Sequence, residues 1–194
     1  LIIGVAIGIV VASIRSTFDK NREVYKRRGG WFYYMQWCLN ALAQVYLTVI
    51  RGTPVVVQLL ISYFIIFASS RNGVAIAVFA FGLNSGAYVA EIFRGGIMSI
   101  DNGQFEAGRS LGFNYFQTML YIVIPQMFKI VLPTLCNEFI VLLKETSVAG
   151  YVAVVELTKA GNQIKNTTYD QINPILLVAL VYLVVVVGLT KLLG

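Results

Sequence analysis

Long apolar stretches, separated by short polar ones, make up most of this chain. Three uncharged runs, 52–70, 72–90 and 171–190, are each long enough to cross the hydrocarbon core of a bilayer as a helix. A fourth apolar segment, 130–143, is interrupted by Asn137 and Glu138. The pattern therefore predicts an all-α membrane protein.

The first fourteen residues form a further apolar stretch, which begins without methionine. As a helix they would span only about 21 Å, less than the roughly 30 Å of a hydrocarbon core. We therefore expect the chain to start inside its first membrane helix. This gives about five transmembrane helices, the first one truncated, in a single transmembrane domain over residues 1–194.

Residues 29–50 are also uncharged, but their pattern differs from that of the other spans. Polar residues recur at every fourth position, and aromatic rings of the kind favoured at membrane interfaces accompany them. The polar positions are Gln36, Asn40, Gln44 and Thr48, and the rings are those of Trp31, Tyr33, Tyr34, Trp37 and Tyr46. The pattern predicts an interfacial amphipathic helix that lies in the membrane plane.

Composition supports a membrane protein, and the distribution of charge predicts its orientation. The chain is 58% hydrophobic and 12% charged, with a mean hydropathy of +0.76, whereas a soluble domain has about 25% charged residues. Six of the 15 basic residues lie between positions 15 and 28, which is typical of a cytoplasmic loop rather than of a nucleic-acid site. With residues 29–50 in the interface, we expect the N-terminus outside and the C-terminus in the cytoplasm.

In that arrangement most basic residues face the cytoplasm, as the positive-inside rule requires. The cytoplasmic ones are Arg15, Lys20, Arg22, Lys26, Arg27, Arg28, Arg51, Arg94, Arg109, Lys129 and Lys191, and the others are Arg71, Lys144, Lys159 and Lys165.

Several kinds of chemistry are excluded by the residues that the chain lacks. It has no histidine, which excludes histidine-based acid–base catalysis, Ser-His-Asp triads and histidine-liganded metals. The phosphate-binding pattern G-x-x-x-x-G-K-[ST] is also missing. The two cysteines, Cys38 and Cys136, have no paired or metal-ligand spacing. We expect no cofactor, no metal and no ATPase site in this chain.

Residues 99–125 form a polar, glycine-punctuated segment between two apolar ones. Asp101 and Asn114 are candidate helix caps, followed three residues later by Gln104 and Gln117. Gly112 lies between them and allows a tight turn. The segment predicts two short helices joined in an elbow.

The same segment carries the motif Glu106-Ala107-Gly108, then Gly112, then Ile122-Val-Ile124-Pro125. This spacing resembles the cytoplasmic EAA loop of permease subunits in binding-protein-dependent ABC importers. Segments 50–59, 86–97, 137–140 and 144–147 are similar to the polar amino-acid branch of these permeases. The resemblance runs from about residue 50 to the end. Gly108 replaces the second alanine of the motif, Ile124 replaces a leucine, and Glu145 replaces an aspartate.

The resemblance implies a permease subunit of the cytoplasmic membrane, in contact with lipid, that imports polar amino acids by alternating access. It implies a second permease copy or homologue, two ATPase subunits that bind ATP and Mg, and an extracytoplasmic solute-binding protein; no nucleic acid is involved. The elbow would couple to the ATPase through Glu106, Ala107, Gly108, Arg109, Gly112 and Phe113. An ATP-independent channel or facilitator is the alternative, and a membrane enzyme fits less well.

Polar residues inside the predicted spans are the candidates for substrate binding, because ionisable groups in membranes usually face a protein interior or a water-filled path. Glu91 is a poorer candidate, since Arg94 is placed three residues later for an internal ion pair. Glu138 has no basic residue one turn away, which favours a basic amino acid as its partner. The candidates are Gln58, Asn84, Tyr88, Asn137 and Glu138.

Two further patterns predict structure rather than chemistry. Arg51-Gly-Thr-Pro54 is typical of a helix start, with proline in the first turn and arginine at the lipid headgroups. The G-x-x-x-G pairs at Gly4 and Gly8 and at Gly82 and Gly86 predict close helix packing.

Overall fold

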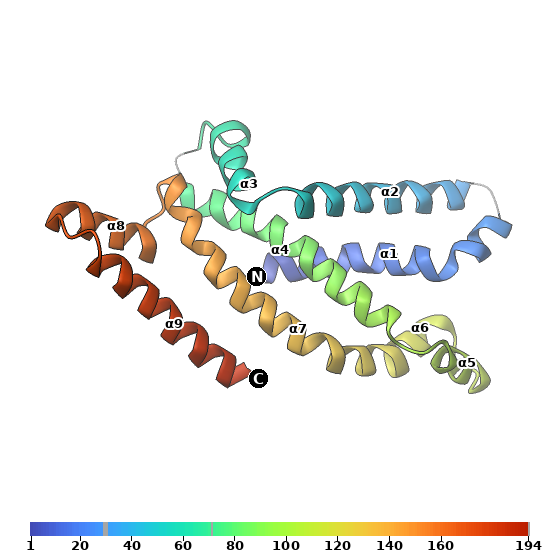
Figure 1. The fold of residues 1–194 in the computed structure, drawn as a ribbon. Helices are drawn as coiled ribbons and strands as arrows, with labels where there is room; N and C mark the ends of the chain where they lie inside the picture. Colours follow the sequence, from blue (N-terminus) through green and yellow to red (C-terminus); the bar gives the residue numbers. More distant parts are fainter. Residues whose placement is uncertain (29–30, 71, 194) are drawn as a thin grey trace.

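The computed structural model describes residues 1–28, 31–70 and 72–193, and this part of the chain contains helices and no strand (Figure 1). The side chains of residues 21–28 and 32 are not described, and these include the predicted cytoplasmic Arg22, Lys26, Arg27 and Arg28. Arg71 and residues 29–30, at the start of segment 29–50, lie outside the described residues. The α-helices are α1 (Ile2–Arg28), α2 (Trp31–Gly52), α3 (Val55–Ile61), α4 (Gly73–Met98), α5 (Asn102–Ser110), α6 (Tyr115–Thr118), α7 (Ile124–Glu145), α8 (Leu157–Thr168) and α9 (Asn173–Leu193). Two π-helical stretches, η1 (Ser62–Ile66) and η2 (Met119–Val123), and a 3-10 stretch, η3 (Thr146–Val152), complete them.

Four described helical stretches are long and apolar enough to cross a membrane, and a fifth crossing is formed if a bent pair counts as one. The four are Ile2–Lys20, Gly73–Met98, Tyr115–Val152 and Asn173–Leu193, and the bent pair is Tyr33–Gly52 with Val55–Ile66. The predicted all-helical fold with about five crossings is confirmed. The first stretch is longer than predicted, because the helix continues beyond Ile14 through Lys20 and on to Arg28.

Helices α1 and α4 run parallel and in close contact, and the small residues of both G-x-x-x-G pairs lie between them. A Cβ atom added at Gly8 would lie 2.5 Å from Val89 Cγ1, and one added at Gly86 would lie 3.0 Å from Ile7 Cγ2. Either position would collide with the neighbouring helix if it carried a side chain. The predicted close packing is therefore confirmed, and the two pairs pack against each other.

Helix α2 lies antiparallel along α1 (Figure 1). Arg15 Nη1 of α1 donates to Asn40 Oδ1 of α2 at 3.3 Å, and Tyr46 donates to the Leu83 carbonyl of α4 at 2.6 Å. Asn40, one position of the predicted polar stripe, is buried against α1 rather than turned to water.

Helices α4 and α7 run antiparallel and enclose two hydrophobic clusters. The cluster nearer α5 and α6 contains Val89, Phe93 and Ile97 of α4 with Met127 and Val131 of α7. The other cluster joins Phe81 of α4 to Leu142 of α7 and Leu59 of α3. We call the end of the bundle that carries α5 and α6 the elbow end. These two clusters fix the register of α7 against α4.

At the opposite end, α8 leads into α9 through a turn held by Asp170. Its carboxylate accepts the backbone N–H groups of Ile172 at 3.0 Å and Asn173 at 3.1 Å and the Asn173 side-chain amide at 2.6 Å. These hydrogen bonds, led by that of the Asn173 side chain, lower the pKa of Asp170. The charged carboxylate therefore caps the start of α9.

Candidate functional site

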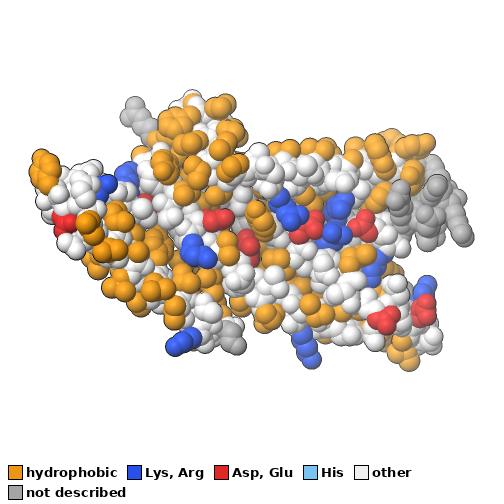
Figure 2. Space-filling model, in the orientation of Figure 1, with side chains coloured by type: hydrophobic (Ala, Val, Ile, Leu, Met, Phe, Trp, Pro, Cys, Tyr) orange, Lys and Arg blue, Asp and Glu red, His pale blue; other side chains and the backbone are white. Residues whose placement is uncertain are grey.

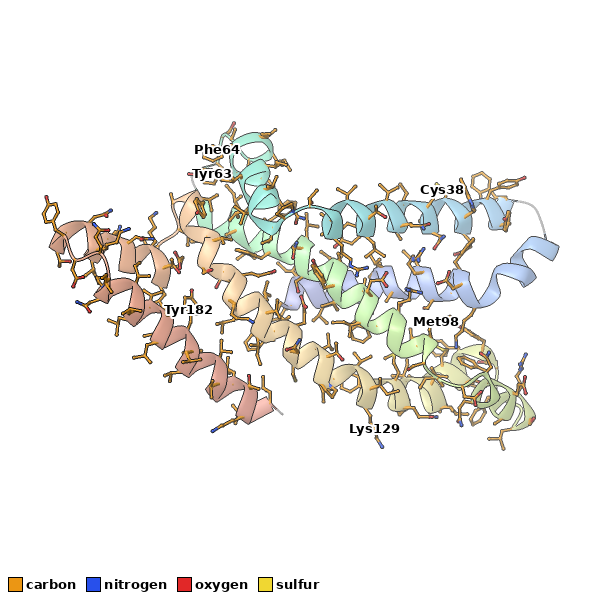
Figure 3. The ribbon with its side chains drawn as sticks, viewed as in Figure 1. Cys38, Tyr63, Phe64, Met98, Lys129 and Tyr182 are labelled. Carbon is orange, nitrogen blue, oxygen red and sulfur yellow. The ribbon has the colours of Figure 1, made fainter. Side chains whose placement is uncertain are left out.

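The predicted elbow is present at one end of the bundle as α5 and α6, and Figure 3 shows Met98 at the end of α4 that leads into it. Asp101 caps α5 by accepting the backbone N–H of Gly103 at 2.8 Å. The predicted partner Gln104 does not complete a capping box. Its side-chain oxygen instead accepts from Gln126 Nε2 of α7 at 3.1 Å, which ties α5 to the next long helix.

A tight turn at Gly112 ends α5. Gly112 has φ +80°, a region in which L-residues with a Cβ atom are strained. The Phe113 N–H donates to the Gly108 carbonyl at 3.0 Å, and the Gly112 N–H donates to the Arg109 carbonyl at 2.9 Å. This pair of bonds is a Schellman motif, which satisfies the last carbonyls of the helix. The predicted role of Gly112 is confirmed.

A reciprocal capping box starts α6. Asn114 Oδ1 accepts the Gln117 N–H at 2.9 Å, and Gln117 Oε1 accepts the Asn114 N–H at 2.9 Å. The predicted cap is confirmed. Because α6 continues through η2 into α7, the Tyr115–Val152 stretch forms one long helical element, and the elbow is fixed directly to a membrane helix.

Gly108 lies where α5 touches α6, and its contact explains why this position is glycine here. A Cβ atom at Gly108 would lie 2.6 Å from Thr118 Oγ1 and 2.7 Å from Thr118 Cγ2. Thr118 is 2% exposed and donates its hydroxyl hydrogen bond to the Asn114 carbonyl at 3.0 Å. The threonine thus fills the space that an alanine at position 108 would need.

We expect Gly108→Ala to lower the stability of the elbow in the native background and to raise it in a Thr118→Ala background. Alanine is favoured over glycine inside a helix by about 0.5–1 kcal/mol, but overpacking costs about 1–3 kcal/mol, so the clash with Thr118 decides the sign. A double-mutant cycle of thermal unfolding on the purified protein measures the coupling. Additive effects of the two substitutions would contradict this packing.

The outer surface of the elbow combines exposed apolar and charged side chains. Leu111 is 70% exposed and Phe116 is 71% exposed, and Glu106, Ala107 and Arg109 are also exposed. Phe113 is half-buried, with its ring 6.0 Å from that of Tyr121. A rigid, capped element that displays apolar side chains is suited to docking another protein.

A hollow of about 1120 Å³ separates the elbow from the end of α1. It is lined by Glu106 and Arg109 of α5, by Ser99 after α4 and by Lys20 of α1. The Lys20 Nζ atom lies 3.6 Å from the centroid of the Phe105 ring. The ends of α1 and α4 therefore meet at the elbow.

This arrangement predicts that single cysteines at positions 20 and 99, introduced after Cys38 and Cys136 have been replaced, react from the same side of the membrane. Both positions line the hollow beside the elbow. Labelling of intact cells and inverted vesicles with a membrane-impermeant maleimide measures the side. Labelling from opposite sides would overturn the pairing of α1 with α4.

Two of the predicted substrate-binding residues, Gln58 and Asn84, lie around the junction between α2 and α3, where the chain bends by 107°. Gln58 Nε2 donates to the carbonyl of Ile50 at 2.7 Å and to the carbonyl and hydroxyl of Thr53 at 3.0 and 2.8 Å. A broken helix inside a membrane leaves backbone carbonyls that need partners. The amide of Gln58 supplies these partners and holds the bend.

Asn84 joins the same network from α4. Its Nδ2 atom donates to Gln58 Oε1 at 3.0 Å, and the residue is 3% exposed. Tyr88, one turn further toward the elbow end, is 36% exposed. Gln58 and Asn84 are thus brought together, with their amides engaged by the protein, whereas the partly exposed ring of Tyr88 lies beside Arg51.

Asn137 and Glu138 lie on α7. Asn137 is exposed and Glu138 is half-buried, and among the described residues neither side chain has a hydrogen bond or an ion pair. Glu138 lies between the two places at which α7 is fixed to α4, near Val131 and near Leu142.

The structure adds a charge network that the sequence only partly predicted. Arg94 pairs with Glu91 at 3.1 Å, as expected, and also with Asp19 of α1 at 3.4 Å. Arg51 lies 4.0 Å from Glu91 and 5.7 Å from the centroid of the Tyr88 ring. Arg51 ends α2 beside Tyr88 and Glu91 of α4. The contacts with Asp19 and Arg51 join residues too distant in sequence for spacing to reveal.

Comparison with known proteins places these features in a family. Residues 29–193 match the family of binding-protein-dependent transport system inner membrane components. The chain is 40% identical to the L-cystine transport system permease protein TcyB of Bacillus subtilis over 69% of its own length and 58% of the length of TcyB. It is 37% identical to the glutamine transport system permease protein GlnP of Escherichia coli (strain K12), over 79% of its own length and 72% of GlnP.

A solved structure shares the whole fold. The crystal structure of an amino acid ABC transporter with histidines superposes with a TM-score of 0.76 and 35% sequence identity, covering 100% of this chain and 88% of the other.

Proposed function

Because this chain belongs to the family of binding-protein-dependent transport system inner membrane components, we propose that it is the permease subunit of an ATP-driven importer of polar amino acids. The observation that carries the proposal is the elbow. It is a capped, rigid pair of helices with exposed apolar side chains, and it is continuous with a membrane helix. Its sequence has the spacing of the EAA loop, and the relatives that it matches are named as amino-acid permeases.

The proposed assembly contains partners that supply what this chain lacks. Two ATPase subunits bind ATP and Mg and dock on the elbows of two permeases, which are two copies of this chain or this chain and a homologue. An extracytoplasmic solute-binding protein delivers the substrate to the opposite end. The N-terminus lies outside and the C-terminus in the cytoplasm of the cell membrane, which puts the elbow and the ends of α1 and α4 on the ATPase side.

The geometry indicates how a movement of the elbow reaches the transport path. Through η2, α6 continues into α7, and α5 is bonded to α7 through Gln104 and Gln126. Helix α4 is joined to α5 by three residues, the last of which, Asp101, caps α5. A displacement of the elbow by the ATPase dimer therefore moves α4 and α7 together, and these helices carry Tyr88 and Glu138.

We assign the substrate path to the region around Tyr88, Asn137 and Glu138. A carboxylate at this depth is costly unless it faces a partner or water, and Glu138 has no cationic partner among the described residues. A basic amino acid, or the ammonium group of any amino acid, supplies that partner. Gln58 and Asn84 support this region by holding the bend between α2 and α3, since their amides are bonded to the protein.

Co-expression with the ATPase subunit encoded beside this chain tests the docking role. We expect a tagged permease to co-purify with the ATPase. The double variant Leu111→Asp with Phe116→Asp should abolish this association without preventing membrane insertion, because charges replace the exposed apolar side chains of the elbow. Lys129→Gln is the matched control, since Lys129 projects away from α7 (Figure 3). Unchanged association of the double variant would defeat the docking role.

A further inference from the structure

Arg51 is a charged side chain in the middle of the bundle whose role the elbow and the ion pairs do not explain. It lies in the last turn of α2, directly before the bend held by Gln58. Its neighbours on α4 are Tyr88 and Glu91, ten and seven residues before Met98 at the elbow end of that helix. At 1.5 Å per residue this is about 10 to 15 Å inside the end of α4.

The guanidinium is accessible in spite of this depth. The side chain of Arg51 is 45% exposed, compared with 28% for Arg94. Figure 2 shows charged side chains in a band across the middle of this face, where α2 passes α4, while the surfaces over α3 and α9 are largely hydrophobic. A charge at this depth faces a protein interior or a water-filled path rather than lipid. The guanidinium of Arg51 is therefore accessible to a ligand from this face.

The ion pair with Glu91 leaves most of the hydrogen-bonding capacity of Arg51 unused. Its closest approach to Glu91 is 4.0 Å, whereas Arg94 bonds the same carboxylate at 3.1 Å. Arg51 donates no hydrogen bond within the described residues. The Tyr88 ring, 5.7 Å away, supports the guanidinium without using its N–H groups. Five N–H donors in a fixed plane are thus available for a ligand.

A guanidinium of this kind matches one ligand group best. Its fork binds a carboxylate with two parallel hydrogen bonds. Every amino acid carries an α-carboxylate together with a positive group, and Glu138 on α7 is a half-buried carboxylate without an ion pair among the described residues. We propose, on the basis of the proposed transport of amino acids, that Arg51 binds the α-carboxylate of the substrate in the membrane-spanning path.

This assignment gives the two charged side chains complementary roles. Arg51 on α2 recognises the group that all amino acids share, and Glu138 on α7 attracts the positive end.

Direct binding to the purified permease–ATPase complex in nanodiscs, without the solute-binding protein, tests the role of Arg51. The probes are the radiolabelled amino acid that the complex takes up best and the same amino acid with its α-carboxylate converted to an amide. We expect Arg51→Gln to weaken binding of the amino acid by about tenfold or more, the loss of a charge-assisted bidentate contact, and to leave the weak binding of the amide unchanged. Lys129→Gln is the control for loss of a basic residue.

The outcomes separate this inference from the function on which it rests. Equal weakening of both probes by Arg51→Gln, or no weakening of either, overturns the role of Arg51. If Arg51→Gln does not assemble, Arg51→Lys decides. It keeps the charge beside Glu91 but loses the planar fork. We therefore expect binding of the amino acid to weaken by about threefold to tenfold and binding of the amide to stay the same. Unchanged binding of the amino acid overturns the inference. Absence of amino-acid uptake and binding in the native complex would instead defeat the proposed function.

Discussion

Gly112→Val should leave the permease inserted in the membrane but reduce transport by about tenfold or more. Gly112 has φ +80°, and valine in this region is strained by about 1–3 kcal/mol because its Cβ atom is branched. The turn can escape the strain only by breaking the two hydrogen bonds that end α5. Since 1.4 kcal/mol corresponds to a factor of ten, a misplaced elbow should dock poorly on the ATPase.

Substrate-stimulated ATP hydrolysis by the reconstituted complex measures this effect, together with co-purification of the ATPase. Gly112→Asn is the matched control, because asparagine tolerates the left-handed region better than other residues with a side chain. We expect the asparagine variant to retain most of the native activity. Normal hydrolysis and normal assembly of the valine variant would show that the elbow is not the coupling element.

Glu138→Gln should reduce amino-acid uptake by about tenfold or more without preventing folding. Glutamine keeps the size and polarity of the side chain but removes the charge, and hydrogen bonds to a charged group are worth about 1.5–3 kcal/mol. The side chain has no hydrogen bond or ion pair among the described residues, so no structural contact is lost. Glu138→Asp, which keeps the carboxylate on a shorter side chain, is the matched control.

The same assay tests the charge of the substrate. We expect unlabelled arginine, histidine or lysine to compete for uptake more strongly than glutamate or aspartate. Preferred uptake of an acidic amino acid would contradict the substrate assignment. Uptake by Glu138→Gln at the native rate would show that this residue contributes packing rather than binding.

The sequence predicted those parts of the molecule that depend on local chemistry. The capping box at Asn114 and Gln117 and the turn at Gly112 are determined within a few residues, because they satisfy the free backbone groups at helix ends. The G-x-x-x-G pairs were also informative, since glycine at this spacing marks a close approach of helices. The sequence did not say which helices approach, and the pairing of α1 with α4 came from the structure.

The contacts of the polar stripe on α2 could not be predicted, because hydropathy does not distinguish a polar stripe facing water from one facing another helix. Asn40 accepts a hydrogen bond from Arg15, 25 positions away, so its polar side chain serves a contact between two helices. Gln58 is a similar case, since its spacing suggested a free polar group but its amide completes a broken helix. The direction of the bend after Arg51, which brings α3 against α4, could not be predicted either, because it has no local sequence signal.

Uptake into proteoliposomes tests the central claim most directly. The purified permease is reconstituted with its ATPase subunit and solute-binding protein, and entry of radiolabelled amino acids is followed with ATP, without ATP and with an ATPase subunit that binds but does not hydrolyse ATP. We predict accumulation against a concentration gradient only when ATP is hydrolysed. Equal, downhill entry under all three conditions would contradict the account and identify an ATP-independent facilitator.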